Sequence, residues 1–216
     1  FNYEENCLLY IPDSPLNVQI GSEKEVEYLA EQICRLVEAA HGHTLVLFTS
    51  YALMGAVYNQ IKDRLSFPLM EVWRHSSDMI HKFKQANNAV LFAAGSCWEG
   101  VDFPGDMVSS LIIVRLPFPV PDPLSEAERE QYPSLQDYIR AVIIPDMQVK
   151  LRQGFGRAIR TETDTCVISV LDHRAAPGER YHQAVLEALP NLRITRKIKE
   201  VEEFIRAKKS SDYFLS

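Results

Sequence analysis

Four short apolar runs limit the folds that this 216-residue chain can adopt. They span residues 44–49, 89–93, 111–114 and 165–170 and consist mainly of aliphatic and aromatic side chains. Runs of this length without polar alternation are typical of parallel strands buried on both faces. Stretches with helical patterning separate them. This alternation predicts an α/β fold with a mostly parallel sheet, helices on both faces and right-handed crossovers.

Several of the intervening helices have recognisable start signals. Ser22 followed by Glu25 resembles a capping box and predicts a helix over 23–40. Ser50 is a good N-cap for a helix over 51–65. The other expected elements are short strands over 8–11 and 72–73, and helices over 78–85, 125–131, 179–189 and 198–208.

Composition and charge indicate a soluble globular protein without a membrane span. Hydrophobic residues make up 46% and charged residues 24%, as in soluble globular proteins. No apolar run reaches the roughly 20 residues that a membrane span needs. Residues 140–216 hold 14 Lys and Arg against 10 Asp and Glu, whereas residues 1–139 hold 9 against 19, so a polyanion site is expected to draw on the C-terminal third. The four cysteines lack ligand spacing, which predicts reduced thiols in a cytoplasmic protein.

The segment Gln153–Arg160, with the sequence QGFGRAIR, is the strongest candidate for a functional site. Read as a helix, it places Gln153, Arg157 and Arg160 on one side and apolar residues on the other. Two guanidinium groups and an amide suit an anion with several oxygens, such as a triphosphate. Two helical glycines cost about 1 kcal/mol each relative to alanine, which indicates close approach of a backbone or a ligand. The alternative is a solvated basic face on an ordinary helix.

A loop punctuated by three glycines, Gly95–Gly105, follows one of the apolar runs. Thr49 and Ser50 follow another of these runs. In open parallel sheets, ligands bind beyond the carboxyl ends of the strands, so the loop and these two residues are candidates for ligand binding. Glu99 and Asp102 are carboxylates, so a ribose hydroxyl or a neighbouring Arg is a more natural partner for them than a phosphate. The alternative is a plain acidic surface loop.

Three residues near these runs have a simple structural interpretation. Ser50 could bind a phosphate through its hydroxyl and the helix N-terminus, or act as an N-cap only, and the two roles are compatible. Asp172 and Arg174 follow the last apolar run, and we expect them to form a structural ion pair.

Three segments resemble motifs of superfamily-two helicases in the DinG/XPD-like branch. Residues 153–160 resemble motif VI, and the WEGVDFPG segment at 98–105 resembles motif V, whose Gly-x-Asp core matches Gly100 to Asp102. Residues 45–51 resemble motif IV. The resemblance covers roughly residues 1–210 and implies a RecA-like second motor domain of an ATP-dependent DNA helicase, a cytoplasmic enzyme of DNA repair.

The resemblance also implies roles for individual residues. Arg157 and Arg160 would act on the γ-phosphate of ATP as arginine fingers, assisted by Gln153. Asp102 would meet the ribose. The loop residues that would bind the nucleotide are Glu99, Gly100 and Asp102. The residues that would contact single-stranded DNA are Thr49, Ser50 and Ser96.

The chain lacks a GxxxxGK[ST] loop and an Asp-Glu-Ala-His-like motif, which position the phosphates and Mg²⁺ in such motors. The resemblance therefore implies a first motor domain in the same polypeptide, which would hold most of the Mg²⁺ site. Residues 1–22 are expected to be the connector from that domain, and residues 23–216 the motor domain itself. This chain alone is expected to be inactive. It is also expected to hold no metal or iron–sulfur cluster and to contact no membrane.

Two other classes of function compete with the motor. One is a helicase-derived module that holds nucleic acid or a partner without motor activity. The other is an interaction domain with a degenerate cleft, which the intact Asp102, Arg157 and Arg160 argue against.

Overall fold

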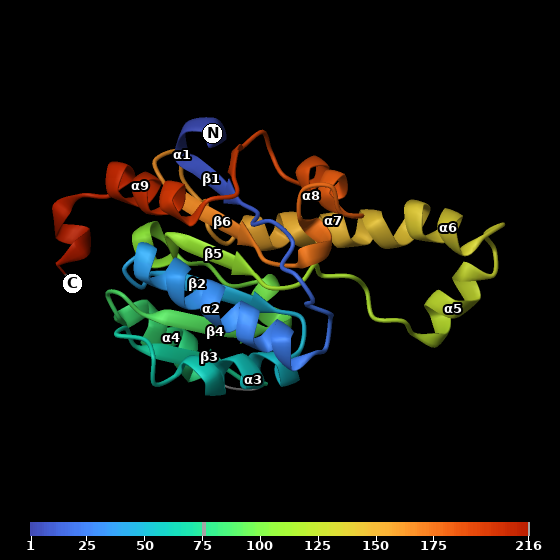
Figure 1. The fold of residues 1–216 in the computed structure, drawn as a ribbon, viewed down its shortest axis with the longest axis horizontal. Helices are drawn as coiled ribbons and strands as arrows, with labels where there is room; N and C mark the ends of the chain where they lie inside the picture. Colours follow the sequence, from blue (N-terminus) through green and yellow to red (C-terminus); the bar gives the residue numbers. More distant parts are fainter. Residues whose placement is uncertain (75–76, 216) are drawn as a thin grey trace.

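The computed structural model describes residues 1–74 and 77–215, without the side chains of Ser77, Ser96 and Cys97, and its centre is a seven-stranded sheet (Figure 1). The strand order is β3-β4-β2-β5-β6-β1-β7, and all the strand pairs are parallel. The strands are β1 Cys7–Tyr10, β2 Thr44–Phe48, β3 Leu69–Val72, β4 Val90–Ala94, β5 Ser110–Ile113, β6 Cys166–Val170 and β7 Arg193–Thr195. The predicted α/β fold with a parallel sheet is confirmed.

Helices occupy most of the connections between these strands. They are α1 Tyr3–Asn6, α2 Glu23–Ala39, α3 Tyr51–Ile61, α4 Ser77–Gln85, α5 Pro123–Arg129, α6 Leu135–Tyr138, α7 Ile144–Phe155, α8 His182–Ala188 and α9 Ile198–Lys208. Among the described residues, no helix is both long and apolar enough to cross a bilayer.

The sheet is the middle of three layers. One face packs against α2, α3 and α9, and the other packs against α4, α7 and α8. In β2, Val46 and Phe48 face the α2 layer, whereas Leu45 and Leu47 face the α7 layer. Because successive side chains of a strand point to opposite faces, burial on both faces requires an apolar run without polar alternation.

Residues 7–10 form β1, which lies inside the sheet between β6 and β7. The strand expected over 8–11 is therefore present, shifted by one residue. All four of its side chains are buried. The division into a connector over 1–22 and a motor domain over 23–216 stays a prediction.

A long helical segment leads from α6 into α7 through a π-helical turn at Ile139–Ile143. Pro145 cannot donate a backbone hydrogen bond, and its ring crowds the preceding turn. The proline predicts an interruption of the helix, and the chain instead widens into the π-helical turn just before it. With α5, this segment forms an arm that projects from the body of the domain (Figure 1).

Candidate functional site

Helix α7 ends at Phe155, with Gly156 as its C-cap, and residues 156–158 form a turn. The expectation of one continuous helix through Arg160 was wrong. Gly156 keeps a right-handed backbone with φ −63°, and its N–H still donates to the Arg152 carbonyl, but the helical conformation does not continue beyond it. Arg157 therefore lies in the turn, and Arg160 lies beyond it, while Gln153 remains in the helix.

The turn nevertheless brings both guanidinium groups to Asp102. Arg160 Nη2 donates to Asp102 Oδ1, and Arg157 Nη1 lies 3.5 Å from the same oxygen. Arg157 Nη1 also donates to the Val101 carbonyl at 2.7 Å, and its Nε donates to the Gln153 carbonyl at 3.3 Å. The motif V-like loop and the motif VI-like turn are thus joined through Arg157, Arg160 and Asp102, which we call the Asp102 cluster.

Exposure distinguishes the members of the Asp102 cluster. The side chain of Asp102 is 72% exposed, that of Arg160 34% and that of Arg157 14%. Exposed ion pairs contribute only about 0–1 kcal/mol to stability, so a ligand with more oxygens than one carboxylate can compete for these arginines. Arg157 and Arg160 thus share one exposed carboxylate.

One of the two glycines of the motif has a packing reason. A Cβ on Gly154 would lie 2.9 Å from a ring carbon of Trp98. That indole is buried, and its Nε1 donates to the Phe48 carbonyl at 3.0 Å, so it cannot easily move aside. The sequence predicted close approach of a backbone or a ligand, whereas at Gly154 a side chain makes the close approach. Nothing in the packing around Gly156 explains the second glycine.

The Gly95–Gly105 loop needs all three of its glycines for their backbone conformation. Gly95, Gly100 and Gly105 have φ values of 62°, 77° and 62°, which strain other residues. The loop begins at the carboxyl end of β4, but Asp102 contacts residues that follow α7. The segment that follows the motif VI-like turn and contains Glu162 is held near the amino end of β1, because Asn6 Nδ2 donates to the Glu162 carbonyl at 2.9 Å. Glu99 and Gly100 are exposed on this loop.

The other candidate residues lie at the carboxyl edge of the sheet. Thr49 is exposed, and Ser50 caps α3, with its Oγ accepting from the Leu53 N–H at 3.3 Å. The side chain of Ser96 lies outside the described residues. A pocket of about 260 Å³ opens at this edge. Its lining residues are Phe48, Thr49, Gly95, Trp98, Pro117, Phe118, Pro119, Val120, Asp146 and Lys150.

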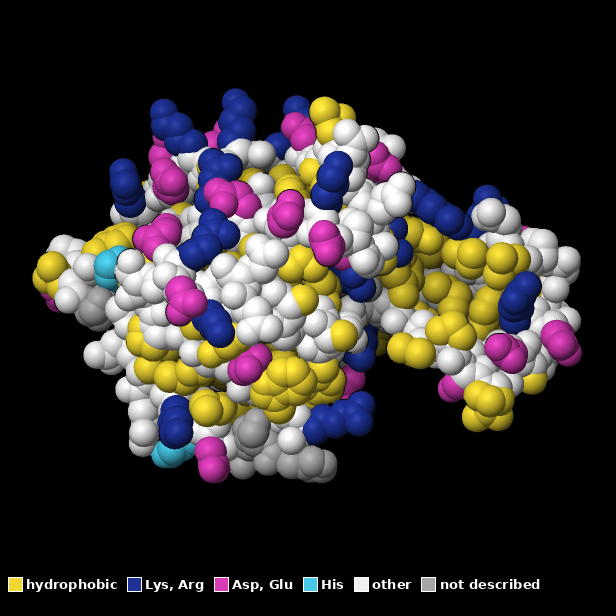
Figure 2. All heavy atoms as spheres, turned by 60° about the horizontal axis from the view of Figure 1, so that its bottom comes forward, with side chains coloured by type: hydrophobic (Ala, Val, Ile, Leu, Met, Phe, Trp, Pro, Cys, Tyr) yellow, Lys and Arg dark blue, Asp and Glu magenta, His cyan; other side chains and the backbone are white. Residues whose placement is uncertain are grey.

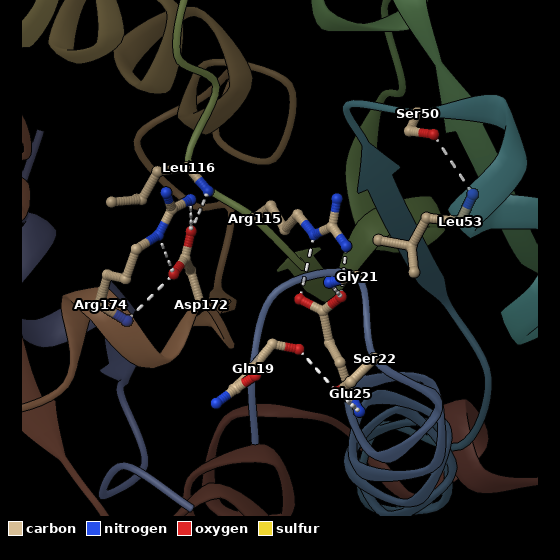
Figure 3. A network of polar contacts seen from close by, with 10 residues as sticks. All are labelled: Gln19, Gly21, Ser22, Glu25, Ser50, Leu53, Arg115, Leu116, Asp172 and Arg174. Carbon is tan, nitrogen blue, oxygen red and sulfur yellow. Dashed lines mark hydrogen bonds and ion pairs between the residues drawn. The ribbon is translucent and has the colours of Figure 1, made fainter. Parts of the chain in front are cut away.

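Two ion pairs with buried carboxylates lie at the same edge and help to connect distant segments (Figure 3). Arg174 binds Asp172 with two hydrogen bonds, Nε to Oδ1 at 3.0 Å and Nη2 to Oδ2 at 2.7 Å, which agrees with the structural pair expected from the sequence. Asp172 Oδ2 also accepts from the backbone N–H of Leu116 at 2.8 Å. This carboxylate therefore fixes the segment after β5 to the segment after β6.

The second pair, Arg115 with Glu25, was missed by sequence reasoning. Ser22 Oγ accepts from the Glu25 N–H at 3.2 Å, as the capping box predicts. The Glu25 carboxylate instead binds both Arg115 Nε and Nη2, and it accepts from the Gly21 N–H at 3.0 Å. A signal was present in the sequence, since Arg115 follows a buried strand and needs an acidic partner.

The environment of Asp172 acts on its pKa in opposite directions. Burial alone would raise this pKa, but the hydrogen bonds and charge of Arg174, with the N–H groups of Leu116 and Arg174, outweigh burial and lower it. Asp172 therefore stays ionised at neutral pH.

Among the described residues, no group of three or more His, Cys, Asp or Glu side chains is placed to hold a metal ion.

Comparison with known proteins agrees with the motifs. The helicase C-terminal domain family matches residues 33–192. The chain is 36% identical over 213 residues to the ATP-dependent DNA helicase YoaA of Haemophilus influenzae, covering 96% of this chain and 32% of that protein. It is 30% identical to the 3'-5' exonuclease DinG of Bacillus subtilis, covering 97% and 23%. The chain thus spans a third or less of the length of these relatives.

Solved structures with low sequence identity share the fold. An XPD helicase matches with a TM-score of 0.65 at 24% identity, over 88% of this chain and 35% of that one. The C-terminal domain of the DEAD-box protein Dbp5 matches with a TM-score of 0.58 at 14% identity, over 95% and 99%. The parallel sheet with helices on both faces is therefore a RecA-like helicase fold.

Proposed function

Because the chain belongs to the helicase C-terminal domain family, in the DinG/XPD-like branch of superfamily-two helicases, we propose that it works as the second motor domain of an ATP-dependent DNA helicase. ATP would bind in a cleft shared with a first motor domain of the same polypeptide. That domain would supply the phosphate-binding loop and most of the Mg²⁺ site, for which this chain has no motif.

The observation that supports this function most is the Asp102 cluster. Arg157 and Arg160 come from the motif VI-like turn and share one exposed carboxylate of the motif V-like loop. Guanidinium groups held by a weak exposed pair can transfer to phosphate oxygens without large rearrangement. The donor set therefore fits a triphosphate, which offers more acceptor oxygens than Asp102 alone.

In this proposal the cluster changes partners during each cycle. Arg157 and Arg160 leave the Asp102 carboxylate and meet the charge that develops on the γ-phosphoryl group, while Gln153 assists. Asp102, once released, accepts from the ribose hydroxyl, next to Gly100 and Glu99. ATP and Mg²⁺ supply the phosphoryl chemistry, and the residues of this chain position and stabilise the charge.

The carboxyl edge of the sheet provides the proposed contact with single-stranded DNA. The hydroxyl of exposed Thr49, the N-terminus of α3 at Ser50 and the loop at Ser96 would bind successive phosphates. Closure of the two motor domains on ATP and their opening after hydrolysis would then move the strand across this edge.

Phosphate release tests the two-domain proposal. The chain alone should show no DNA-stimulated ATP hydrolysis, whereas a polypeptide joining it to a first motor domain with a phosphate-binding loop should hydrolyse ATP and unwind duplex DNA. DNA-stimulated turnover that follows the isolated chain through purification would overturn the shared site. Binding of DNA by the joined polypeptide without turnover would favour a nucleic-acid-binding module instead.

A further inference from the structure

Two aromatic side chains stack beyond the carboxyl ends of β2 and β3, which lie on either side of β4 in the sheet. Tyr51 begins α3 just after β2, and Trp73 directly follows β3. Their ring centroids are 5.5 Å apart, and the ring planes are inclined by 18°. The guanidinium carbon of Arg74 lies 5.5 Å from the centroid of the Tyr51 ring. We call Tyr51, Trp73 and Arg74 the aromatic patch.

The aromatic patch is not part of the core. Val72, the last residue of β3, is 7% exposed, whereas Trp73 is 44% exposed. The edge of its indole lies against α3 at Gly55, where a Cβ would be 3.7 Å from Cη2. The indole therefore touches the helix with one edge and stacks on the Tyr51 ring, while 44% of Trp73 stays exposed. Figure 2 shows apolar side chains gathered on the lower part of the body, with Lys and Arg side chains beside them.

The patch adjoins the residues for which we propose phosphate contacts. Tyr51 directly follows Thr49 and Ser50 in the chain. Its hydroxyl lies 3.2 Å from the position of a Cβ on Gly95, so it also reaches the start of the glycine loop. A strand whose phosphates lie at Thr49 and Ser50 would have its bases within reach of Trp73.

We propose that the aromatic patch is a base-stacking platform for single-stranded nucleic acid, with Trp73 as the stacking residue. This inference rests on the proposed DNA-binding edge and adds a base contact to its phosphate contacts. Every base has a π face, so such stacking tolerates any sequence. The planar, permanently charged Arg74 is suited to the adjoining phosphate or to a stacked base.

Fluorescence offers a direct readout, because the chain contains two tryptophans and Trp98 is 1% exposed. Titration with oligothymidylate at low salt should quench the tryptophan emission of the wild-type chain. Trp73→Ala should abolish the quenching, although Trp98 still emits. Unchanged quenching in this variant would overturn the proposal.

Affinity for a labelled oligonucleotide gives an independent test. Trp73→Ala should weaken binding by about 5- to 150-fold, which corresponds to the 1–3 kcal/mol typical of stacking on one base at about 1.4 kcal/mol per tenfold change. Trp73→Phe should retain most of the affinity. On a fully abasic strand, the wild-type chain and Trp73→Ala should bind equally, because no base is left to stack.

The chain contains a matched control. Phe1 and Tyr3 stack with the same inclination of 18° and a centroid distance of 5.3 Å, and Phe1 is 62% exposed. This pair precedes β1 and therefore lies at the opposite edge of the sheet. Phe1→Ala should leave oligonucleotide binding unchanged.

The outcomes separate this inference from the proposed function. Wild-type binding that Trp73→Ala does not weaken, or that it weakens equally on the abasic strand, would overturn the base-stacking platform alone. A wild-type chain that binds no oligonucleotide even at low salt would overturn the platform together with the proposed DNA-binding edge.

Discussion

Arginine–carboxylate contacts occur in two very different settings in this molecule. The side chains of Asp172 and Glu25 are 0% and 4% exposed. Each of these carboxylates binds a segment that is distant in the sequence, Asp172 through the backbone N–H of Leu116 and Glu25 through Arg115. The carboxylate of Asp102 is 72% exposed and faces two arginines at once. The same chemistry therefore fixes the architecture in one place and leaves exchangeable cations in the other.

The difference follows from solvation. Breaking a buried pair leaves an uncompensated charge in a medium that solvates it poorly, so the partners cannot separate in the folded state. An exposed pair loses little when it opens, because water and salt replace the partner. Arg157 is intermediate, since it is 14% exposed and also binds the Val101 and Gln153 carbonyls. On these grounds, we expect the side chain of Arg160 to exchange partners more readily than that of Arg157.

The largest loss of stability is expected at the buried pair. Asp172→Ala should lower the free energy of unfolding by about 3–5 kcal/mol, because Arg174 loses both hydrogen bonds and the Leu116 N–H loses its acceptor. Denaturant unfolding followed by circular dichroism measures this change. A loss below about 1 kcal/mol would show that the pair does not fix the fold.

A smaller, pH-dependent effect should come from the same carboxyl group. The folded-state pKa of Asp172 is lowered, so its contribution is complete above the unfolded pKa of about 3.9 and is lost as the pH falls through the folded value. The difference in unfolding free energy between wild type and Asp172→Asn should therefore be constant above about pH 5 and shrink below about pH 4. A difference that stays constant down to pH 2 would contradict the assigned shift.

The smallest effect is expected at the exposed carboxylate. Asp102→Ala should change the free energy of unfolding by no more than about 0.5 kcal/mol, as is typical of exposed pairs. In the joined polypeptide, the same change should weaken nucleotide affinity more than turnover if Asp102 meets the ribose. Destabilisation as large as that of Asp172→Ala would erase the contrast between the two settings.

Much of the fold could be predicted because burial on both faces leaves a plain pattern in the sequence. The apolar runs at 44–49, 89–93, 111–114 and 165–170 mark four strands closely. β7 could not be recognised, since it has three residues and two of them, Arg193 and Ile194, are exposed. Such a strand depends on pairing with β1 rather than on its own composition.

The candidate site was less predictable than the sheet. Motif resemblance identified Asp102, Arg157 and Arg160, but helical periodicity continued past Gly156, where the helix ends. The pairing of Glu25 with Arg115 joins residues 90 positions apart, so it depends on the packing of α2 against β5 rather than on any local pattern. Local sequence indicates which residues are chemically useful, whereas tertiary packing decides which of them meet.

ATP turnover by arginine variants tests the central claim most directly, in the polypeptide that joins this chain to a first motor domain. Arg157→Ala and Arg160→Ala should each lower turnover by about 10³-fold or more, with DNA binding retained, because arginine fingers contribute roughly 10³ to 10⁵ in rate. Lys at either position should rescue poorly, since it lacks the planar fork. Lys208→Ala, which removes a cation 3.8 Å from Glu5, serves as the control and should change little. Near-normal turnover in both arginine variants would contradict the account and reduce the Asp102 cluster to a solvated basic surface.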